Sequence, residues 1–312
     1  MMSAEHIHPP LLVVMGPTAS GKTSLALELA ERLDGGGELI GADSMQVYRG
    51  MSIGTAKPTE SERARAPHHL LDVADPHRGS FTVHDWLALA RTAIEEIRAR
   101  GARPIVVGGT NLYVRALLEG LIEGPAPDPD LRARLERRAL DELRGELERV
   151  DPEAAARIHR NDRRRTIRSL EVHAITGTPL SELQGQWDAA PRRTDIRIIG
   201  LHWAAEEINP RINARVKAMF EAGFVEEVRT LLESDRLGTQ AREALGYKQI
   251  AEHLEGLRTL EDTIEEIKIR TRRFAKQQRT WLRRFRHVFG GHWLDPAGKN
   301  SQELALEALR EA

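Results

Sequence analysis

The stretch GPTASGKT, residues 16–23, constrains the fold of this chain more than any other segment. It follows the apolar run at residues 11–15, and residues 24–33 after it carry leucine and alanine at helical spacing. In a loop between a strand and a helix, backbone N–H groups bind phosphate oxygens, a lysine neutralises charge and a hydroxyl ligates magnesium. We therefore predict that this segment is a phosphate-binding loop. The motif alone identifies neither the nucleotide nor the reaction. The pattern G-x-x-x-x-G-K-[ST] is met by Gly16, Gly21, Lys22 and Thr23.

Further strands are expected at residues 38–42 and 104–107, with an amphipathic helix between them at residues 83–101. Buried strands that alternate with helices favour an α/β fold, here a P-loop NTPase-like parallel sheet with helices on both faces. Ligands of such sheets bind outside the carboxyl ends of the strands. Asp43 and Thr110 follow two of the strands, so we expect them to face one crevice together with the phosphate loop.

The composition changes after Leu121, where PAPDPD at residues 125–130 interrupts the alternation. From residue 131 to about residue 183 the sequence is helical in pattern and rich in arginine, and residues 195–203 again have the pattern of a strand. The simplest interpretation is a helical insertion within one α/β core. We predict a discontinuous core of residues 1–120 and 195–312, and an all-helical insertion domain of residues 121–194.

Charge and composition exclude several classes of protein. Lysine and arginine (46) nearly balance aspartate and glutamate (47), so net charge alone predicts neither a nucleic-acid nor a membrane partner. The lack of cysteine excludes disulfides, a thiolate nucleophile and a cysteine-ligated zinc site. The first 16 residues lack the features of a signal peptide, and no apolar run reaches the roughly 18 residues of a membrane span. We expect a cytoplasmic, monomeric protein without a membrane partner.

Asp43 opens the segment GADSMQVYRGMSIGTAKP, residues 41–58. An aspartate at the end of a strand can be a magnesium ligand, a general base or a cap for the next helix, and its position alone does not choose among them. The residues after it combine polar side chains with a tyrosine, two glycines (Gly50 and Gly54) and Pro58. We expect an ordered loop over the crevice that recognises a substrate.

Two basic segments stand out in this neutral chain. Residues 157–168 hold six arginines and one aspartate, and residues 268–287 hold nine lysines and arginines with no acidic residue. Such clusters raise the expectation of nucleic-acid binding, although a charged face is often simply solvated. Aromatic residues recur at helical spacing in the second segment, and we expect Phe274 and Phe285 to lie in the core.

Taken in order, the blocks GPTASGKT, DSMQVYRGMSIGTAKP, VVGGTNLY, NDRRRTIRSLEV, ALGYKQI and QQRTWLRRF strongly resemble bacterial tRNA dimethylallyltransferases, also called tRNA isopentenyltransferases. The resemblance covers nearly the whole chain. It implies transfer of a dimethylallyl group from dimethylallyl diphosphate to the exocyclic amine N6 of the adenosine beside the anticodon, with release of pyrophosphate. The phosphate loop would then hold a prenyl diphosphate.

The resemblance also implies roles for individual residues. Asp43 is expected as the general base and Arg215 as a cation facing the diphosphate, while Lys22 and Thr23 act from the loop, Thr23 as the ligand of Mg²⁺. The residues expected to bind the diphosphate are Gly16, Pro17, Thr18, Ala19, Ser20, Gly21, Lys22 and Thr23.

The same resemblance implies contacts with the anticodon stem-loop of tRNA. The target base would leave its stack and enter the crevice, and the RNA backbone would lie on the basic segments. Arg164 stands where family members commonly have glutamine, so we expect a phosphate contact there. The residues expected to bind tRNA are Asp43, Ser44, Met45, Gln46, Thr110, Arg132, Arg164, Arg165, Arg168, Lys276, Arg279 and Arg283.

Two other classes of function fit part of the sequence. A small-molecule kinase that uses ATP would account for the phosphate loop and for an arginine-rich lid, but it leaves the second basic segment unexplained. A nucleotide-regulated RNA-binding module without catalysis would use Asp43 only as a cap. Replacement of Asp43 and a test for ATP consumption distinguish these classes from a transferase.

Overall fold

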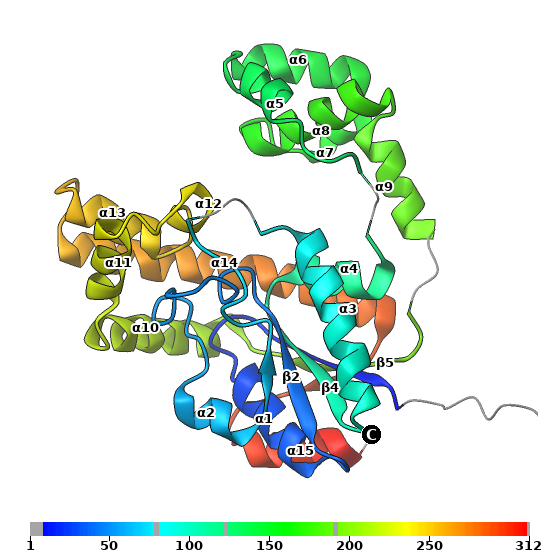
Figure 1. The fold of residues 1–312 in the computed structure, drawn as a ribbon, viewed down its shortest axis with the longest axis vertical. Coiled ribbons are helices and arrows are strands. Elements are labelled where there is room, and N and C mark those ends of the chain that lie inside the picture. The colour runs from blue at the N-terminus through cyan, green and yellow to red at the C-terminus, as the bar shows by residue number, and fades with distance from the viewer. Residues whose placement is uncertain (1–8, 78–80, 122–123, 190–192, 311–312) are drawn as a thin grey trace, which may run out of the picture. The chain divides into compact units, whose positions relative to one another are not determined.

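The structure is a computed structural model that describes residues 9–77, 81–121, 124–189 and 193–310 (Figure 1). The chain folds into two compact units. The first consists of Met1–Val114 with Thr194–Ala312, and the second of Arg115–Arg193. The first unit is therefore built from two separate parts of the sequence.

The first unit contains one sheet of six strands in the order β3-β2-β4-β1-β5-β6, and every neighbouring pair is parallel. The central strand β1 pairs with β4 on one side and with β5 on the other, so Val13 lies opposite both Val106 and Ile198. The strands are β1 (Leu11–Met15), β2 (Gly37–Ala42), β3 (His68–His69), β4 (Arg103–Gly108), β5 (Ile196–Leu201) and β6 (His292–Leu294).

Apolar side chains on both faces of the strands explain why the sheet is covered by helices. All five residues of β1 are buried, as a strand in the middle of a parallel sheet requires. Helix α1 follows β1 and contacts both the sheet and α15, whereas α3 contacts β2 and β4 (Figure 1). The helices of this unit are α1 (Lys22–Arg32), α2 (Glu60–Arg65), α3 (Val83–Ala99), α10 (Ala205–Glu221), α11 (Phe224–Glu233), α12 (Thr239–Arg242), α13 (Tyr247–Leu254), α14 (Leu260–Phe289) and α15 (Ser301–Arg310).

The second unit is built from helices around a small core of its own. Leu143 and Leu147 of one helix pack with Leu170 of another in this core. Aspartate side chains cap three of the helix N-termini, as at Asp162, which accepts a hydrogen bond from Arg165 N. Helix α4 (Asn111–Glu119) spans the boundary of the two units, and the others are α5 (Pro129–Glu136), α6 (Leu140–Val150), α7 (Pro152–Arg157), α8 (Arg163–Thr176) and α9 (Leu180–Ala189).

The predicted fold class is confirmed, because the sheet is wholly parallel and is surrounded by helices. The expected strand at residues 195–203 is the shorter β5. Two edge strands, β3 and β6, were not predicted because they have only two and three residues. His68 and His69 form β3, and the His69 ring lies 2.6 Å from Glu38 Oε2. None of the helices in the described part of the chain has both the length and the apolar character that crossing a bilayer requires.

The buried position of Leu39 in β2 generates a stability prediction. Leu39 is 0% exposed, so the Leu39→Ala variant should lower the free energy of unfolding by about 2–5 kcal/mol through lost burial and a residual cavity. Leu257 is 72% exposed, and Leu257→Ala should change it by less than about 0.5 kcal/mol. Urea denaturation followed by circular dichroism measures both values. Equal effects of the two substitutions would contradict this description of the core.

Candidate active site

The principal cavity of the first unit lies at the carboxyl ends of the strands and has a volume of about 340 Å³. Residues of the phosphate loop, the segment after β2 and the segment after β4 all line it, as the sequence predicted for Asp43 and Thr110. Helices α10 and α14 complete its wall with Arg215 and Gln278. Segments far apart in the sequence therefore meet at one site.

The phosphate loop has the backbone conformation that its glycine pattern predicts. Gly21 has a φ of +88°, a left-handed conformation that glycine adopts at no steric cost, and α1 begins at the next residue. Ala19 also has a positive φ, +62°, which is unfavourable for alanine. Its carbonyl oxygen accepts a hydrogen bond from Arg211 Nε at 3.0 Å.

Trp203 and Arg211, which are not part of the phosphate loop, donate hydrogen bonds to its backbone. The indole Nε1 of Trp203 donates to Ser20 O at 3.0 Å, and the guanidinium of Arg211 stacks 4.7 Å from the centre of the same indole ring. The loop is thus held by a tryptophan and an arginine that the sequence analysis did not identify. Ser20 itself is buried, and its hydroxyl has no hydrogen-bond partner among the described residues.

Gln278 of α14 connects the phosphate loop to the end of β4. Its Oε1 accepts a hydrogen bond from Thr18 N at 2.8 Å, and its Nε2 donates to Gly109 O at 2.9 Å. A Cβ atom at position 109 would lie 2.5 Å from Gln278 Nε2 and would displace the amide from these hydrogen bonds. Gln278 was not predicted as a site residue. The sequence does contain a signal for it, because Gln278 is a polar residue on the stripe of α14 that Phe274 and Phe285 define, and its amide is buried.

The cations Lys22 and Arg215 and the carboxylates of Asp43 and Glu243 line the cavity. Desolvation and the nearby Arg215 guanidinium lower the pKa of Lys22 to about 8, and the Asp43 carboxylate opposes this shift. Desolvation likewise lowers the pKa of Arg215, again against the effect of Asp43. The Glu62 carboxylate also opposes the shift of Arg215. The two desolvated cations can pair with the negative charges of an anionic ligand.

Asp43 forms a turn at the end of β2. Its Oδ1 accepts hydrogen bonds from Met45 N at 2.9 Å and from Gln46 N at 3.3 Å, and Ser44 N donates to Thr110 Oγ1 at 2.9 Å. Of the three roles left open for Asp43, the structure therefore shows the cap, although it caps a turn and not a helix. The turn uses Oδ1, so Oδ2 can accept a proton from a ligand in the cavity.

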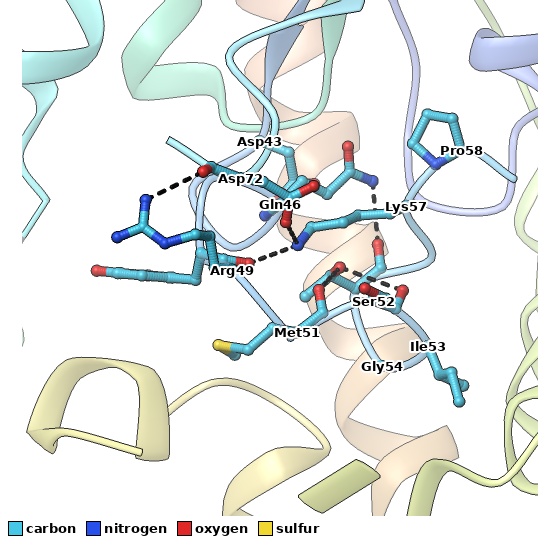
Figure 2. Close-up of polar contacts among 12 residues, drawn as sticks. Asp43, Gln46, Arg49, Met51, Ser52, Ile53, Gly54, Lys57, Pro58 and Asp72 are labelled. Carbon is cyan, nitrogen blue, oxygen red and sulfur yellow. Dashed lines mark hydrogen bonds and ion pairs between the residues drawn. The ribbon is translucent and has the colours of Figure 1, made fainter. Parts of the chain in front are cut away.

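The loop after Asp43 is ordered by its own polar contacts (Figure 2). Gln46 Nε2 donates to Thr55 O at 3.0 Å and to Ala56 O at 3.1 Å. Lys57 is buried, and its Nζ lies 2.5 Å from both Tyr48 O and Asp72 Oδ1. Burial lowers the pKa of Lys57, while the Asp72 carboxylate opposes that effect. The expected ordered loop over the crevice is present.

One wall of the cavity is apolar, which the sequence analysis did not predict. The expectation that Phe274 lies in the core was wrong, because its side chain is 43% exposed and lines the cavity, whereas Phe285 is fully buried as expected. Phe274 stands on the side of α14 that faces this opening. The apolar residues that line the cavity include Ile212, Val216, Met219, Phe224, Leu245, Ile267 and Phe274.

The oxygen groups of the cavity fit a magnesium ion that is shared with a ligand. Thr23 and Asp43 line the cavity and offer hydroxyl and carboxylate oxygens. Within the described ranges, no three acidic or histidine side chains are grouped to hold a metal by themselves. Magnesium commonly takes only one or two protein ligands when substrate phosphates supply others, so this donor set is compatible with it.

The predicted RNA-binding arginines of the second unit differ in their surroundings. Arg132 and Arg168 each lie 2.7 Å from Glu171, whose side chain is fully buried, so both also stabilise this unit. Arg164 and Arg165 on α8 are exposed, and Arg165 makes only a 3.4 Å ion pair with Asp162. These two arginines present the more accessible charges.

The second basic segment forms part of the 30-residue helix α14. Lys276 and Arg283 are exposed, whereas Arg279 is half-buried. Arg272 on the same helix donates to Asn213 Oδ1 of α10 at 2.6 Å. The helix therefore contributes Phe274 and Gln278 to the cavity and exposed cations to the surface.

Comparison with known proteins identifies the family. Residues 46–285 match the family described as IPP transferase. The chain is 46% identical to the tRNA dimethylallyltransferase of Geobacter metallireducens, with 93% of each chain covered. It is 48% identical to the tRNA dimethylallyltransferase of Anaeromyxobacter dehalogenans, with 92% of this chain and 95% of that one covered.

Solved structures lead to the same family. The full-length tRNA isopentenylpyrophosphate transferase of Bacillus halodurans matches with a TM-score of 0.70 and 39% identity, over 97% of this chain and 95% of that chain. A eukaryotic dimethylallyltransferase acting on tRNA matches with a TM-score of 0.79 and 31% identity, over 95% of this chain and 77% of that chain.

The lowered pKa of Lys22 generates a prediction about pH. The lysine is charged below about pH 8 and loses its proton above it, so affinity for an anion should fall as pH rises from 7 to 9. The loss should approach about tenfold per pH unit at most. Isothermal titration with isopentyl diphosphate, an unreactive diphosphate monoester whose ionisation is complete above about pH 7, measures it.

Two variants control for other titrating groups. Lys22→Met should bind weakly and without this pH dependence. Lys217→Met, which removes a 76% exposed lysine of α10, should keep it. Affinity that stays constant or rises over this range in the unchanged protein would show that Lys22 remains charged.

Proposed function

This chain belongs to the IPP transferase family, and we propose that it transfers a dimethylallyl group from dimethylallyl diphosphate to N6 of the adenosine beside the anticodon of tRNA, releasing pyrophosphate. The observation that carries this proposal is that one cavity combines a phosphate loop, a carboxylate and an apolar wall. The names of the relatives support the same reaction.

The two halves of the prenyl donor fit the two kinds of lining. The diphosphate would lie at the phosphate loop, where backbone N–H groups, Lys22 and Arg215 supply positive charge. The five-carbon chain would lie on the apolar wall that includes Phe274 and Met219. A nucleoside triphosphate has a polar ribose and base in place of that chain, so the apolar wall favours a prenyl diphosphate.

The chemistry needs charge stabilisation at the leaving group and a proton acceptor at the nucleophile. The bond between C1 of the prenyl group and the diphosphate oxygen breaks, and its electron pair leaves with the pyrophosphate. The N6–C1 bond forms, and N6 passes one proton to the Asp43 carboxylate. Lys22 and Arg215 stabilise the negative charge that develops on the departing oxygens, and the turn around Oδ1 orients Asp43.

Magnesium is part of the proposal. Thr23 would hold it through its hydroxyl oxygen, next to the diphosphate. A bound Mg²⁺ would neutralise charge on the diphosphate and so make pyrophosphate a better leaving group.

The tRNA would bind by its backbone to the basic segments and by its base in the cavity. Arg164 and Arg165 on α8, with Lys276 and Arg283 on α14, are exposed cations suited to phosphate contacts. The loop that begins at Asp43 would receive the extruded adenine. Each of these proposed contacts is assigned from the residues of one unit alone.

Replacing Asp43 tests the proposed reaction. Asp43→Asn keeps an acceptor for the turn but removes the base, so turnover should fall by roughly 10²-fold or more while tRNA affinity is kept. Asp34→Asn, in the turn before β2, should leave both unchanged. Transfer is measured by incubation with magnesium, radiolabelled dimethylallyl diphosphate and unmodified tRNA, followed by nucleoside chromatography.

The outcomes of this assay separate the classes of function. Label in an adenosine derivative supports the transferase. ATP hydrolysis without tRNA and without transfer would instead indicate a kinase-like enzyme. An Asp43→Asn variant that kept every measurable function would indicate a binding module.

Salt dependence tests the proposed RNA-binding segments. If cations bind tRNA phosphates, affinity should fall at least about tenfold between 50 and 200 mM salt. Lys276→Gln should make this slope shallower, whereas Lys299→Gln should not, because Lys299 pairs with Glu307 near the C-terminus. Fluorescence anisotropy with a labelled anticodon stem-loop measures the slopes. A flat dependence in the unchanged protein would remove both basic segments from the proposed interface.

A further inference from the structure

Glu227 of α11 binds the backbone of the loop that follows Gln46. Its Oε2 accepts hydrogen bonds from Ser52 N at 2.9 Å and Ile53 N at 2.7 Å, and its Oε1 accepts one from Gly54 N at 3.1 Å. Three consecutive N–H groups thus converge on one carboxylate. A carboxylate that accepts several backbone N–H bonds forms charge-assisted interactions, which are stronger than neutral ones.

Tyr247 of α13 completes this arrangement. Its hydroxyl donates to Glu227 Oε1 at 2.6 Å. Burial raises the pKa of Tyr247, and the Glu227 carboxylate raises it further, so the hydroxyl keeps its proton and remains a donor. The ring of Tyr247 also packs edge-on against Phe224, with ring centres 5.1 Å apart.

The loop that Glu227 binds is also closely packed against aromatic rings. A Cβ atom at Gly54 would overlap the Phe224 ring and lie 2.7 Å from the Tyr247 ring, so no larger residue fits. Lys57 fixes the end of the loop through Tyr48 O and Asp72 (Figure 2). The segment from Ser52 to Lys57 therefore has little freedom to move without breaking the bonds to Glu227.

This loop in turn fixes the amide of Gln46. The carbonyl oxygens of Thr55 and Ala56 both accept from Nε2, and carbonyls can only accept, so the nitrogen must face the loop. Oε1 is then directed away from these carbonyls (Figure 2). Gln46 lines the cavity, so it can offer this oxygen to a ligand as a hydrogen-bond acceptor.

We propose that Glu227 is a positioning residue, which holds the loop of residues 52–56 so that Gln46 presents an acceptor to the exocyclic amine of the target adenine. The inference rests on the proposed function. The amine is the one hydrogen-bond donor on the Watson–Crick and Hoogsteen edges of adenine, whereas the 6-keto group of inosine would place an acceptor against Gln46 Oε1. If Glu227 no longer held the loop, the Gln46 amide could rotate and present either its oxygen or its nitrogen. It could then bind either adenine or the base of inosine.

A double-mutant cycle tests whether Glu227 acts through Gln46. The variants are Glu227→Gln, Gln46→Ala and the two combined, with Glu226→Gln as the matched control, because Glu226 is the adjacent, 71% exposed glutamate. The readout is the ratio of affinities for anticodon stem-loops that carry adenosine or inosine at the target position. Rates of prenyl transfer to the adenosine stem-loop are measured in parallel.

Positioning through Gln46 has a distinct signature. Glu227→Gln should lower the adenosine-over-inosine ratio at least about fivefold, and the double variant should be no worse than Gln46→Ala alone. Glu226→Gln should match the unchanged protein. Fully additive losses, or a Glu227→Gln variant that behaves like the control, would overturn the inference, since a merely structural role does not depend on Gln46.

The design remains informative if Glu227→Gln folds poorly. Tyr247→Phe removes only the hydroxyl donor to Glu227 and should shift the same ratio in the same direction by a smaller factor, with its melting temperature measured alongside. An unshifted ratio in a folded Tyr247→Phe variant would contradict the proposal. Lack of prenyl transfer by the unchanged protein would refute the proposed function, whereas transfer with unaltered discrimination in the variants would refute this inference alone.

Discussion

The site depends on one buried amide. Gln278 accepts from Thr18 in the phosphate loop and donates to Gly109 at the end of β4. Loss of that side chain would leave two backbone groups without their partner, which costs more than the bonds themselves contribute. Thr110, the next residue, accepts from Ser44 beside Asp43. These bonds connect the phosphate loop to the loop that begins at Asp43.

The site brings two desolvated cations close together. Desolvation lowers the pKa of both Lys22 and Arg215, and the Arg215 guanidinium lowers that of Lys22 further. The burial of these cations is unfavourable by itself, and pairing with a bound anion would offset its cost. The supports outside the loop, Arg211 and Trp203, hold the backbone in place against this repulsion. Stability and function therefore place opposite demands on the same residues.

The sequence predicted what depends on local pattern. Apolar runs and the glycine loop were sufficient for the central strands, for the parallel sheet and for the meeting of Asp43, Thr110 and the phosphate loop. Strands β3 and β6 were missed because two or three residues are too few to show the hydrophobic pattern of a strand. Phe274 was misplaced because helical spacing indicates a shared face without indicating what covers it. The roles of Gln278, Glu227 and Tyr247 were missed because their partners lie at least 169 residues away or on another helix.

The division of the core into two parts has a consequence for synthesis of the chain on the ribosome. Strand β1 precedes the second unit in the chain, whereas its neighbour β5 and helix α15, which contacts α1, both follow that unit. The N-terminal half must therefore wait with one side of its central strand unpaired. The second unit has its own apolar core and can fold during that interval. A nascent chain that stops before Glu227 and Gln278 would carry the phosphate-loop motif without the residues that hold its site together.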